Sequence, residues 1–277
     1  MHFAKLQASG NDFIIVDNRE GELEVFINGI DVEEFVRRVC DRNRGVGADG
    51  LILIEHPEDP LNSFRWRFFN SDGSVAEMCG NGSRCAVRFC YEKGIADEEV
   101  SFETLAGVIK ARVYEGGRVV RVQLTPPSEP SEKKLKLNGS VIEGVFINTG
   151  VPHFIVPVND IEEIDVVGLG RRIRFHGEFE PKGTNVNFLE PLGADTIRIR
   201  TYERGVESET LACGTGATAC ALVSWWKGYI NEKPVKVITK GGDVLMIDFT
   251  EDFKEVFLQG RAVKICEGTI DPEVLTS

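Results

Sequence analysis

Residues 78–85 read MCGNGSRC, and residues 212–219, which lie 134 positions later, read ACGTGATA. Each stretch places a cysteine directly before Gly-x-Gly. Over the longer windows 78–94 and 212–228, the two segments share five of seventeen residues, which are the cysteine, both glycines and a closing Lys-Gly. Because self-similarity at a fixed offset is the mark of an internal repeat, the paired motifs predict that the chain is a duplicated domain.

The repeat extends into segments on both sides of the cysteine motifs. One further pair begins with Asp-Val and carries Arg-Arg at the same place. Another pair reads in both copies as a strand, a Thr-x-x-Gly turn and a second strand. The aligned pairs are residues 31–39 with 165–173, residues 100–113 with 235–247 after one residue of slippage and, more loosely, residues 9–16 with 149–156.

The predicted helices are marked by their caps. Each motif cysteine stands at the N-terminus of a segment of about fourteen residues, which Gly94 ends in the first copy and Gly228 ends in the second. A shorter helix is predicted over residues 32–40 from the helical spacing of its apolar residues, with Asp31 as N-cap and Glu34 completing a capping box. Both motif cysteines are therefore predicted to lie at helix N-termini.

Most of the remaining chain consists of short β-branched and aromatic runs separated by glycine, which are typical of strands. The Pro- and Ser-rich stretch 125–134 is the best candidate linker. We predict an α+β fold of two pseudo-symmetric duplicated domains, each a mostly antiparallel sheet or open barrel wrapped around a central helix, with the active site in the cleft between them. The first half is predicted over residues 1–122, completed by the C-terminal tail 263–277, and the second half over residues 123–262.

Bulk composition narrows the functions that the chain can have. Its 277 residues are enough for about two domains, and the formal net charge of −12 disfavours a nucleic-acid surface, which needs clustered Lys and Arg. No apolar run approaches the roughly 18 residues of a membrane span, and residues 1–13 have no signal-peptide core. We therefore expect a cytoplasmic protein that binds neither nucleic acid nor membrane.

The seven cysteines lack the spacing of a disulfide framework and are expected to be free thiols. Four of them lie among apolar neighbours, where cysteine behaves as a small hydrophobic residue. The four that we expect to fill the core are Cys40, Cys90, Cys220 and Cys266.

The paired motifs indicate a specific chemistry. A cysteine at a helix N-terminus lies beside unpaired backbone N–H groups and the positive end of the helix dipole. Such surroundings lower a thiol pKa from about 8.5 to roughly 3.5–7.5 at known sites, so that the sulfur can be a thiolate at neutral pH. The Gly-x-Gly removes side chains from the first turn, which lets a carboxylate approach the same N–H groups.

One such motif would indicate a cysteine nucleophile, which usually needs a histidine. Two motifs related by duplication favour racemisation, with one thiol on each face of a single carbon. One thiolate would remove the α-proton while the opposite thiol delivers a proton, and both helix N-termini would stabilise the carboxylate as charge builds on it. This scheme needs no cofactor, and nothing in the sequence is typical of a pyridoxal phosphate site.

Two alternatives stay open at this point. A metal or thiol-redox protein could use four of the cysteines, but their spacings of five and six intervening residues differ from the two to four typical of zinc sites, and Cys-x-x-Cys is missing. The nearer alternative is another cofactor-independent racemase, such as a proline racemase-like enzyme. The cysteines considered for a metal are Cys79, Cys85, Cys213 and Cys220.

Six blocks follow one another over nearly the whole chain: GNDF (10–13), GVGADG (45–50), FNSDGSVAEMCGNGSRC (69–85), GVPHF (150–154), TNVNF (184–188) and YERGVESETLACGTGA (202–217). These blocks resemble the signature segments of the diaminopimelate epimerases. The resemblance implies an isomerase that interconverts LL- and meso-diaminopimelate without pyridoxal phosphate or metal, in the bacterial route to lysine and peptidoglycan. It implies Cys79 and Cys213 as the catalytic pair. The sequence does not decide the oligomeric state, and a homodimer is one state that it allows.

The resemblance also assigns supporting residues. Arg204 would pair with the distal carboxylate of the substrate, for which a planar guanidinium is suited. His153 and Glu203 resemble residues that tune the two cysteines, each near one thiol. Three asparagines would hold the substrate, and amides at both helix N-termini would bind its carboxylate. The implied substrate-binding residues are Asn11, Asn70, Gly80, Asn81, Asn185, Glu203, Arg204, Gly214 and Thr215.

Without the resemblance these residues have simpler interpretations. Asn11 and Asn70 stand in sequences typical of turns, and the histidine, glutamate and arginine above would more often be loop or surface residues. The chain also departs from the family pattern twice, with Val151 where some members have Asn and Gly50 where some have Gln. Each departure removes a side-chain contact at the distal end of the substrate.

Overall fold

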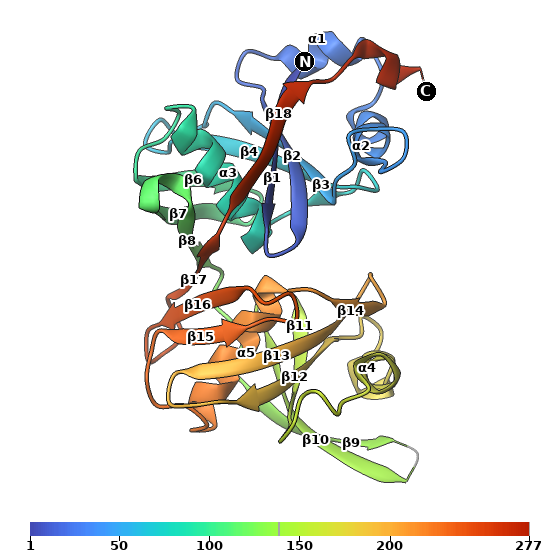
Figure 1. Ribbon diagram of the computed structural model, residues 1–277, viewed down its shortest axis with the longest axis vertical. Helices are drawn as coiled ribbons and strands as arrows, with labels where there is room; N and C mark the ends of the chain where they lie inside the picture. The colour runs from blue at the N-terminus through green and yellow to red at the C-terminus, as the bar shows by residue number, and fades with distance from the viewer. Residues whose placement is uncertain (138, 277) are drawn as a thin grey trace. The chain divides into compact units, whose positions relative to one another are not determined.

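The computed structural model describes residues 1–137 and 139–276 (Figure 1). The chain divides into two compact units, and each has its own core. The first unit contains Met1–Gln123 together with Gly260–Ser277, and the second contains Leu124–Gln259. The first unit is therefore built from both ends of the chain, whereas the second is one continuous segment.

The first unit is a mixed, mostly antiparallel sheet. Two of its neighbouring strand pairs are parallel, and a short strand is added where the fourth strand ends. In spatial order the strands are β18 (Val263–Thr269), β1 (His2–Ala8), β2 (Asn11–Asp17), β3 (Gly50–Glu55, parallel to β2), β4 (Phe64–Asn70), β6 (Glu99–Thr104, parallel to β4), β7 (Gly107–Tyr114) and β8 (Val119–Leu124), with β5 (Val75–Ala76) beside β4.

The second unit repeats this order strand for strand, including the two parallel pairs and the short added strand. The duplication predicted from the cysteine motifs is thus present in the topology. Its strands are β9 (Ser131–Leu137), β10 (Ser140–Asn148), β11 (Pro152–Pro157), β12 (Asn185–Pro191, parallel to β11), β13 (Thr196–Glu203), β15 (Val235–Ile238, parallel to β13), β16 (Val244–Phe249) and β17 (Val256–Arg261), with β14 (Ser208–Thr210) beside β13.

One helix in each unit is surrounded by strands (Figure 1). α3 (Gly80–Glu92) packs on β1, β2, β3 and β7, and α5 (Gly214–Trp226) packs on β10 to β13 and on β15 and β16. Nine consecutive residues of α5 are buried, as expected for a helix with small or apolar residues on every side. Gly94 and Gly228 follow these helices in the left-handed region, with φ of 69° and 70°, as the sequence predicted.

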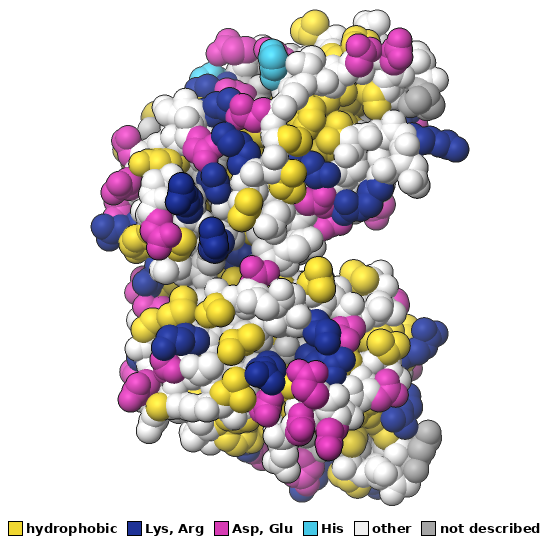
Figure 2. All heavy atoms as spheres, in the orientation of Figure 1, with side chains coloured by type: hydrophobic (Ala, Val, Ile, Leu, Met, Phe, Trp, Pro, Cys, Tyr) yellow, Lys and Arg dark blue, Asp and Glu magenta, His cyan; other side chains and the backbone are white. Residues whose placement is uncertain are grey.

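Smaller helices complete the units. α2 (Val32–Cys40) and α4 (Val166–Arg174) occupy corresponding places in the chain order, and α1 (Glu22–Ile27) belongs to the first unit alone. Among the described residues there are also three short 3₁₀ helices, η1 (Glu115–Gly117), η2 (Gly177–Phe179) and η3 (Pro272–Leu275). In the part of the chain that the structure describes, no helix has the length and apolarity that a membrane crossing requires. Basic and acidic side chains are interspersed on the face of each unit that Figure 2 shows.

Three local predictions were wrong. Asp31 begins α2 without a side-chain capping bond, and Glu34 forms ion pairs with Arg37 at 3.0 Å and Arg38 at 2.7 Å where a capping box would have it reach back. Cys266 is exposed because it lies in β18, most of whose residues face solvent. The last residues of the expected linker, Ser131–Lys134, belong to β9, since they pair with β10 in a regular antiparallel register.

Candidate active site

Both motif cysteines are helix N-caps. Cys79 has extended backbone angles (φ −146°, ψ 119°), and its Sγ accepts a hydrogen bond from the N–H of Gly82 at 3.4 Å. Cys213 repeats this arrangement (φ −128°, ψ 113°), with its Sγ accepting from the N–H of Gly216 at 3.4 Å. The predicted placement at helix N-termini is confirmed. Sulfur atoms that accept from such N–H groups are stabilised when they carry negative charge.

In the first unit, side-chain amides join the start of α3 to β2. Asn81 Nδ2 donates to Asn11 Oδ1 at 2.6 Å, and Asn11 Nδ2 donates to Asp49 Oδ2 at 3.1 Å. Arg84, which is 0% exposed, donates from Nη2 to Asn81 Oδ1 at 2.7 Å. The structure thus brings Asn11 and Asn81 together next to Cys79, with a buried cation that fixes the Asn81 amide.

In the second unit, a buried histidine reaches the cysteine through a hydroxyl group. His153 Nε2 lies 3.0 Å from Thr215 Oγ1, and Thr215 Oγ1 lies 3.4 Å from Cys213 Sγ. His153 is 0% exposed, and this burial, followed by the charge of Arg204, lowers its pKa to about 3. The imidazole is therefore neutral at physiological pH, and it acts on the thiol through Thr215.

Asn185 is engaged with the backbone on both sides. Its Nδ2 donates to the Pro152 carbonyl at 3.0 Å, and its Oδ1 accepts from the Arg204 N–H at 2.8 Å. The Arg204 side chain donates from Nη1 to the Lys182 carbonyl at 3.3 Å. In the described structure Asn185 therefore positions Arg204, which is half-buried and directly follows the last residue of β13.

The two remaining side chains expected at the site lie at strand ends. Asn70 ends β4, is exposed, and donates from Nδ2 to Ser74 Oγ at 3.0 Å across a turn. Glu203 ends β13 and is half-buried, and its carbonyl accepts from the Glu207 N–H at 2.8 Å. Gly80 and Gly214 are the first residues of α3 and α5, as expected for amides at helix N-termini.

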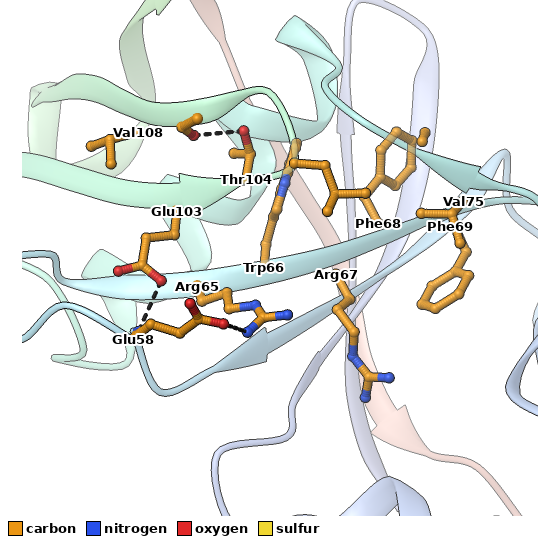
Figure 3. Close-up of a pocket in the computed structure, with 13 residues that line it drawn as sticks. Glu58, Arg65, Trp66, Arg67, Phe68, Phe69, Val75, Glu103, Thr104 and Val108 are labelled. Carbon is orange, nitrogen blue, oxygen red and sulfur yellow. Dashed lines mark hydrogen bonds and ion pairs between the residues drawn. The ribbon is translucent and has the colours of Figure 1, made fainter.

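A pocket of about 470 Å³ lies in the first unit between β4, β5 and the β6–β7 turn (Figure 3). Trp66, Phe68 and Val108 are apolar residues of its wall. Thr104 Oγ1 donates to the Gly107 carbonyl at 2.8 Å across the β6–β7 turn. Figure 3 shows Trp66 and Arg67 leaving β4 in opposite directions. The residues that line this pocket include none of those predicted for the site.

A pocket of about 600 Å³ in the second unit includes one predicted residue, Arg204. Lys182 and Lys133 also line it, and Lys133 Nζ is paired with Glu178 at 2.6 Å. A pocket wall with a guanidinium and an ammonium is suited to a carboxylate. In residues 1–137 and 139–276, no group of three or more His, Cys, Asp or Glu side chains is arranged to hold a metal ion.

Comparison with known proteins decides the family. The profile of the diaminopimelate epimerase family matches residues 3–129 and 145–265. A protein of Aquifex aeolicus (strain VF5) named diaminopimelate epimerase is 65% identical over 99% of this chain and 99% of its own length. One of the same name from Hydrogenobaculum sp. (strain Y04AAS1) is 48% identical over 99% and 100%.

This chain belongs to the diaminopimelate epimerase family. It is an isomerase. A solved structure described as a probable proline racemase from Agrobacterium radiobacter K84 has the same fold, with a TM-score of 0.70, 17% identity and coverage of 99% of this chain and 95% of that one. The predicted α+β fold with two duplicated halves is confirmed.

Sequence reasoning missed three buried polar residues near the helix starts of this diaminopimelate epimerase family member. Arg84 lies inside the first cysteine block, and Asn187 lies inside the block TNVNF, but no role was inferred for either. Thr201, in β13, carried no signal at all. A usable sign was present for Asn187, because an amide in the middle of a strand otherwise made of Val, Phe and Leu needs a hydrogen-bonding partner.

The departure at Gly50 has a structural cause in this family member. A Cβ placed on Gly50 would lie 2.5 Å from the Phe69 carbonyl oxygen and 2.8 Å from the Phe68 ring. β3 and β4 approach too closely there for any larger side chain. Gly50 is therefore required by the close approach of β3 and β4.

Proposed function

We propose that this protein interconverts LL- and meso-diaminopimelate by a two-base mechanism in which Cys79 and Cys213 are the acid and the base. One observation carries the proposal: the two cysteines of the duplicated motif both cap helices in the same way, with each Sγ accepting the N–H of the third residue on. A duplicated fold that repeats a reactive thiol at the same point supports a reaction with one proton transfer on each face of a carbon.

The chemistry balances without another reactant. The thiolate of one cysteine takes the α-proton and becomes a thiol, the carbanion is held by its carboxylate, and the other thiol gives a proton to the opposite face and becomes a thiolate. The net charge of the site is unchanged, and the two sulfurs have exchanged roles. The backbone N–H groups that begin α3 and α5 would stabilise the charge that develops on the α-carboxylate.

Supporting residues have separate tasks in this proposal. Asn11 and Asn81 form an ordered amide pair beside Cys79, and with Asn70 and Asn185 they would hold the amino and carboxylate groups of the substrate. Arg204 would bind the distal carboxylate. His153 and Glu203 would tune the two thiols.

The test is proton exchange at the α-carbon in D₂O, followed by NMR and chiral analysis of LL-diaminopimelate. We expect deuterium incorporation with inversion at one centre, and loss of epimerisation in both Cys79→Ala and Cys213→Ala. A Cys40→Ala variant is the matched control, because Cys40 is a buried thiol in α2. Epimerisation that persists in either active-site variant would contradict the two-thiol mechanism.

The same experiment separates the substrate from the mechanism. Exchange with proline and none with diaminopimelate would keep the two thiols and replace the substrate with a monocarboxylate. Arg204→Met adds a second criterion, since it should raise KM for diaminopimelate strongly if the guanidinium binds the distal carboxylate. An unchanged KM would remove Arg204 from the substrate site.

The proposal places the reaction in lysine and peptidoglycan precursor biosynthesis in the cytoplasm, where a small-molecule dicarboxylate is the only partner that the chemistry needs. A homodimer is part of the same proposal, and light scattering on the purified protein measures it directly. A monomeric mass at the protein concentration of the activity assay would contradict the dimer and leave the reaction untouched.

A further inference from the structure

Three polar side chains lie in a row beneath the N-terminus of α5. They are His153 in β11, Asn187 in β12 and Thr201 in β13, and their exposed fractions are 0%, 0% and 2%. Asn187 and Thr201 are direct partners in the β12–β13 register. Burying polar groups in a row costs free energy unless each is hydrogen-bonded, so the row needs an explanation beyond packing.

The first unit fills the same three places with apolar residues. In the parallel pair of the second unit His153 is the register partner of Asn185, and in that of the first unit Phe13 is the register partner of Gly50. Phe13 therefore corresponds to His153. Two residues further along the partner strands, Ile52 corresponds to Asn187. Ile52 is the register partner of Phe68, which therefore corresponds to Thr201.

The motif glycines confirm this correspondence. A Cβ on Gly82 would meet Ile52 Cδ1 at 3.4 Å, and a Cβ on Gly216 would meet Asn187 Oδ1 at 2.4 Å. Phe13 and Phe68 pack edge to face with ring centroids 5.8 Å apart. The fold is therefore stable with this row apolar, and the polar version in the second unit is not a requirement of the sheet.

The polar row forms one hydrogen-bond chain that ends on the cysteine. Thr201 Oγ1 donates to Asn187 Oδ1 at 2.9 Å. Asn187 Nδ2 lies 2.9 Å from His153 Nδ1 and can only donate, so Nδ1 accepts and the imidazole proton is on Nε2. His153 Nε2–H then donates to Thr215 Oγ1 at 3.0 Å, which leaves the Thr215 proton to point to Cys213 Sγ at 3.4 Å.

We propose that Asn187 and Thr201 are positioning residues, which hold His153 as its Nε2–H tautomer so that Thr215 donates its hydroxyl proton to Cys213 Sγ. This inference rests on the proposed function, in which Cys213 alternates between thiol and thiolate. Every donor in this hydrogen-bond chain points toward the sulfur, so the hydrogen bonds favour the thiolate of Cys213. Its counterpart Cys79 stands over the apolar row and has the buried cation Arg84 in its own helix.

Charged groups also lie around this row of hydrogen bonds. Glu203 ends β13 and Arg204 follows it, and the charge of Arg204 acts on His153 in the direction that keeps the imidazole neutral. Cys220 lies two turns along α5, and its pKa is raised well above the ordinary value by burial and by the charge of Cys213. These groups act on the site alongside the hydrogen-bond chain, which orients one proton toward the sulfur.

Two measurements test the inference without using the substrate. The first is the ¹⁵N chemical shifts of His153 in the full-length protein, which distinguish the protonated from the unprotonated ring nitrogen. We expect Nε2–H in the wild type and Nδ1–H in Asn187→Asp, because a carboxylate accepts where the amide donated. A protonated Nδ1 in the wild type, or an unprotonated Nδ1 in Asn187→Asp, would overturn the inference.

The second measurement is the pH dependence of iodoacetamide alkylation at Cys213, resolved from other thiols by peptide mass spectrometry. We expect the midpoint for Cys213 to rise by about one pH unit in Asn187→Ile, which copies the residue of the first unit, and by less in Thr201→Val. Thr218→Val is the matched control, because this buried hydroxyl of α5 donates to the Gly214 carbonyl and is not part of the hydrogen-bond chain. The Cys79 midpoint should not move in any variant.

Thr201→Val keeps the shape of the side chain, so it serves where Asn187→Ile does not fold. An unchanged Cys213 midpoint in Thr201→Val and in a folded Asn187→Ile, or an equal shift in Thr218→Val, would overturn the inference. A wild type that shows the expected tautomer and midpoints but no exchange with diaminopimelate would reject the proposed function alone.

Discussion

Gly82 and Gly216 hold the same place in the two motifs, yet different neighbours lie where a side chain would go. A Cβ on Gly216 would lie 2.4 Å from Asn187 Oδ1 and 3.3 Å from Cys213 Sγ, whereas the nearest atom to a Cβ on Gly82 is Ile52 Cδ1 at 3.4 Å. Gly216 is therefore required by packing beneath its helix, beyond the open approach to the helix N-terminus that the sequence predicted, whereas Gly82 is not.

The two alanine variants should consequently differ. Gly216→Ala should lower the free energy of unfolding by about 1–3 kcal/mol, because Asn187 must move away from its hydrogen bonds. Gly82→Ala should leave it unchanged within about 0.5 kcal/mol or raise it, since alanine is the better helix former and the contact is an ordinary one. Urea unfolding of both variants measures the difference, and equal losses would contradict it.

His153 should make stability depend on pH in a defined window. Its pKa is lowered from 6.5 to about 3 by burial, so between these values the unfolded chain binds a proton that the folded protein does not. Stability is then fully present above about pH 6.5 and is lost as the pH falls, with a slope of about 1.4 kcal/mol per unit.

The measurement is urea unfolding of the wild type and His153→Gln at pH 5 and pH 6.5, a range chosen above the ordinary titration of carboxylates. The wild type should lose about 1.6 kcal/mol more than the variant over this interval. Equal losses in the two proteins would show that the imidazole is protonated within the folded state.

At the scale of single elements, the same sulfur atoms that would do the chemistry also begin the helices. Cys79 and Cys213 accept from N–H groups that α3 and α5 would otherwise leave unpaired. Serine is a preferred residue at this position and alanine is a poor one.

Serine variants should therefore separate the two roles of each cysteine. Cys79→Ser and Cys213→Ser should keep the stability of the wild type or exceed it, whereas the alanine variants should lose about 0.5–2 kcal/mol. All four should lose epimerisation, because alanine has no ionisable side chain and a serine hydroxyl group does not ionise in the range of a thiol. Serine variants no more stable than alanine variants would show that the cap contributes nothing.

Elements with local signals were predictable from the sequence, and those that depend on distant partners were not. The helices after the two cysteines, with Gly94 and Gly228 at their ends, follow from caps and spacing within one segment. The exposure of Cys266 follows from the position of β18 at the edge of its sheet, which no local pattern reports. Whether an apolar segment is buried depends on where its strand lies in the sheet, and the residues of the segment alone do not determine it.

The candidate site shows the same limit. Asn81 and Thr215 lie inside the two cysteine blocks, so the family resemblance assigned them a place at the helix starts, where the structure puts them. Asn187 and Thr201 act through a register between two strands, and this register is known only once β12 and β13 are paired. The contrast between the polar row and its apolar copy is visible only when both units are folded and compared.

At the scale of the whole molecule, the chain path makes the two units unequal. The first unit is closed by its two ends, because β18 pairs with β1 from His2↔Thr269 to Gln7↔Val263. The backbones of Met1 and Ile270 also join, with the Ile270 N–H donating to the Met1 carbonyl at 2.8 Å. The second unit, Leu124–Gln259, contains all of its own strands except the end of β17.

The second unit should therefore fold by itself, and the first should not fold from its N-terminal part alone. We expect a fragment of residues 124–259 to unfold cooperatively in urea, followed by far-UV circular dichroism, because its core cluster is complete within that segment. A fragment of residues 1–123 lacks β18 and leaves one edge of β1 unpaired, so it should be unfolded or aggregated.

Joining residues 260–277 through a flexible Gly/Ser linker to the front of residues 1–123 restores β18 next to β1 and should restore cooperative unfolding. A matched chain with the sequence of 260–277 scrambled is the control, since it has the same length and composition without the strand. Cooperative unfolding of residues 1–123 alone, or an equal gain from the scrambled tail, would show that the first unit does not depend on the C-terminal strand.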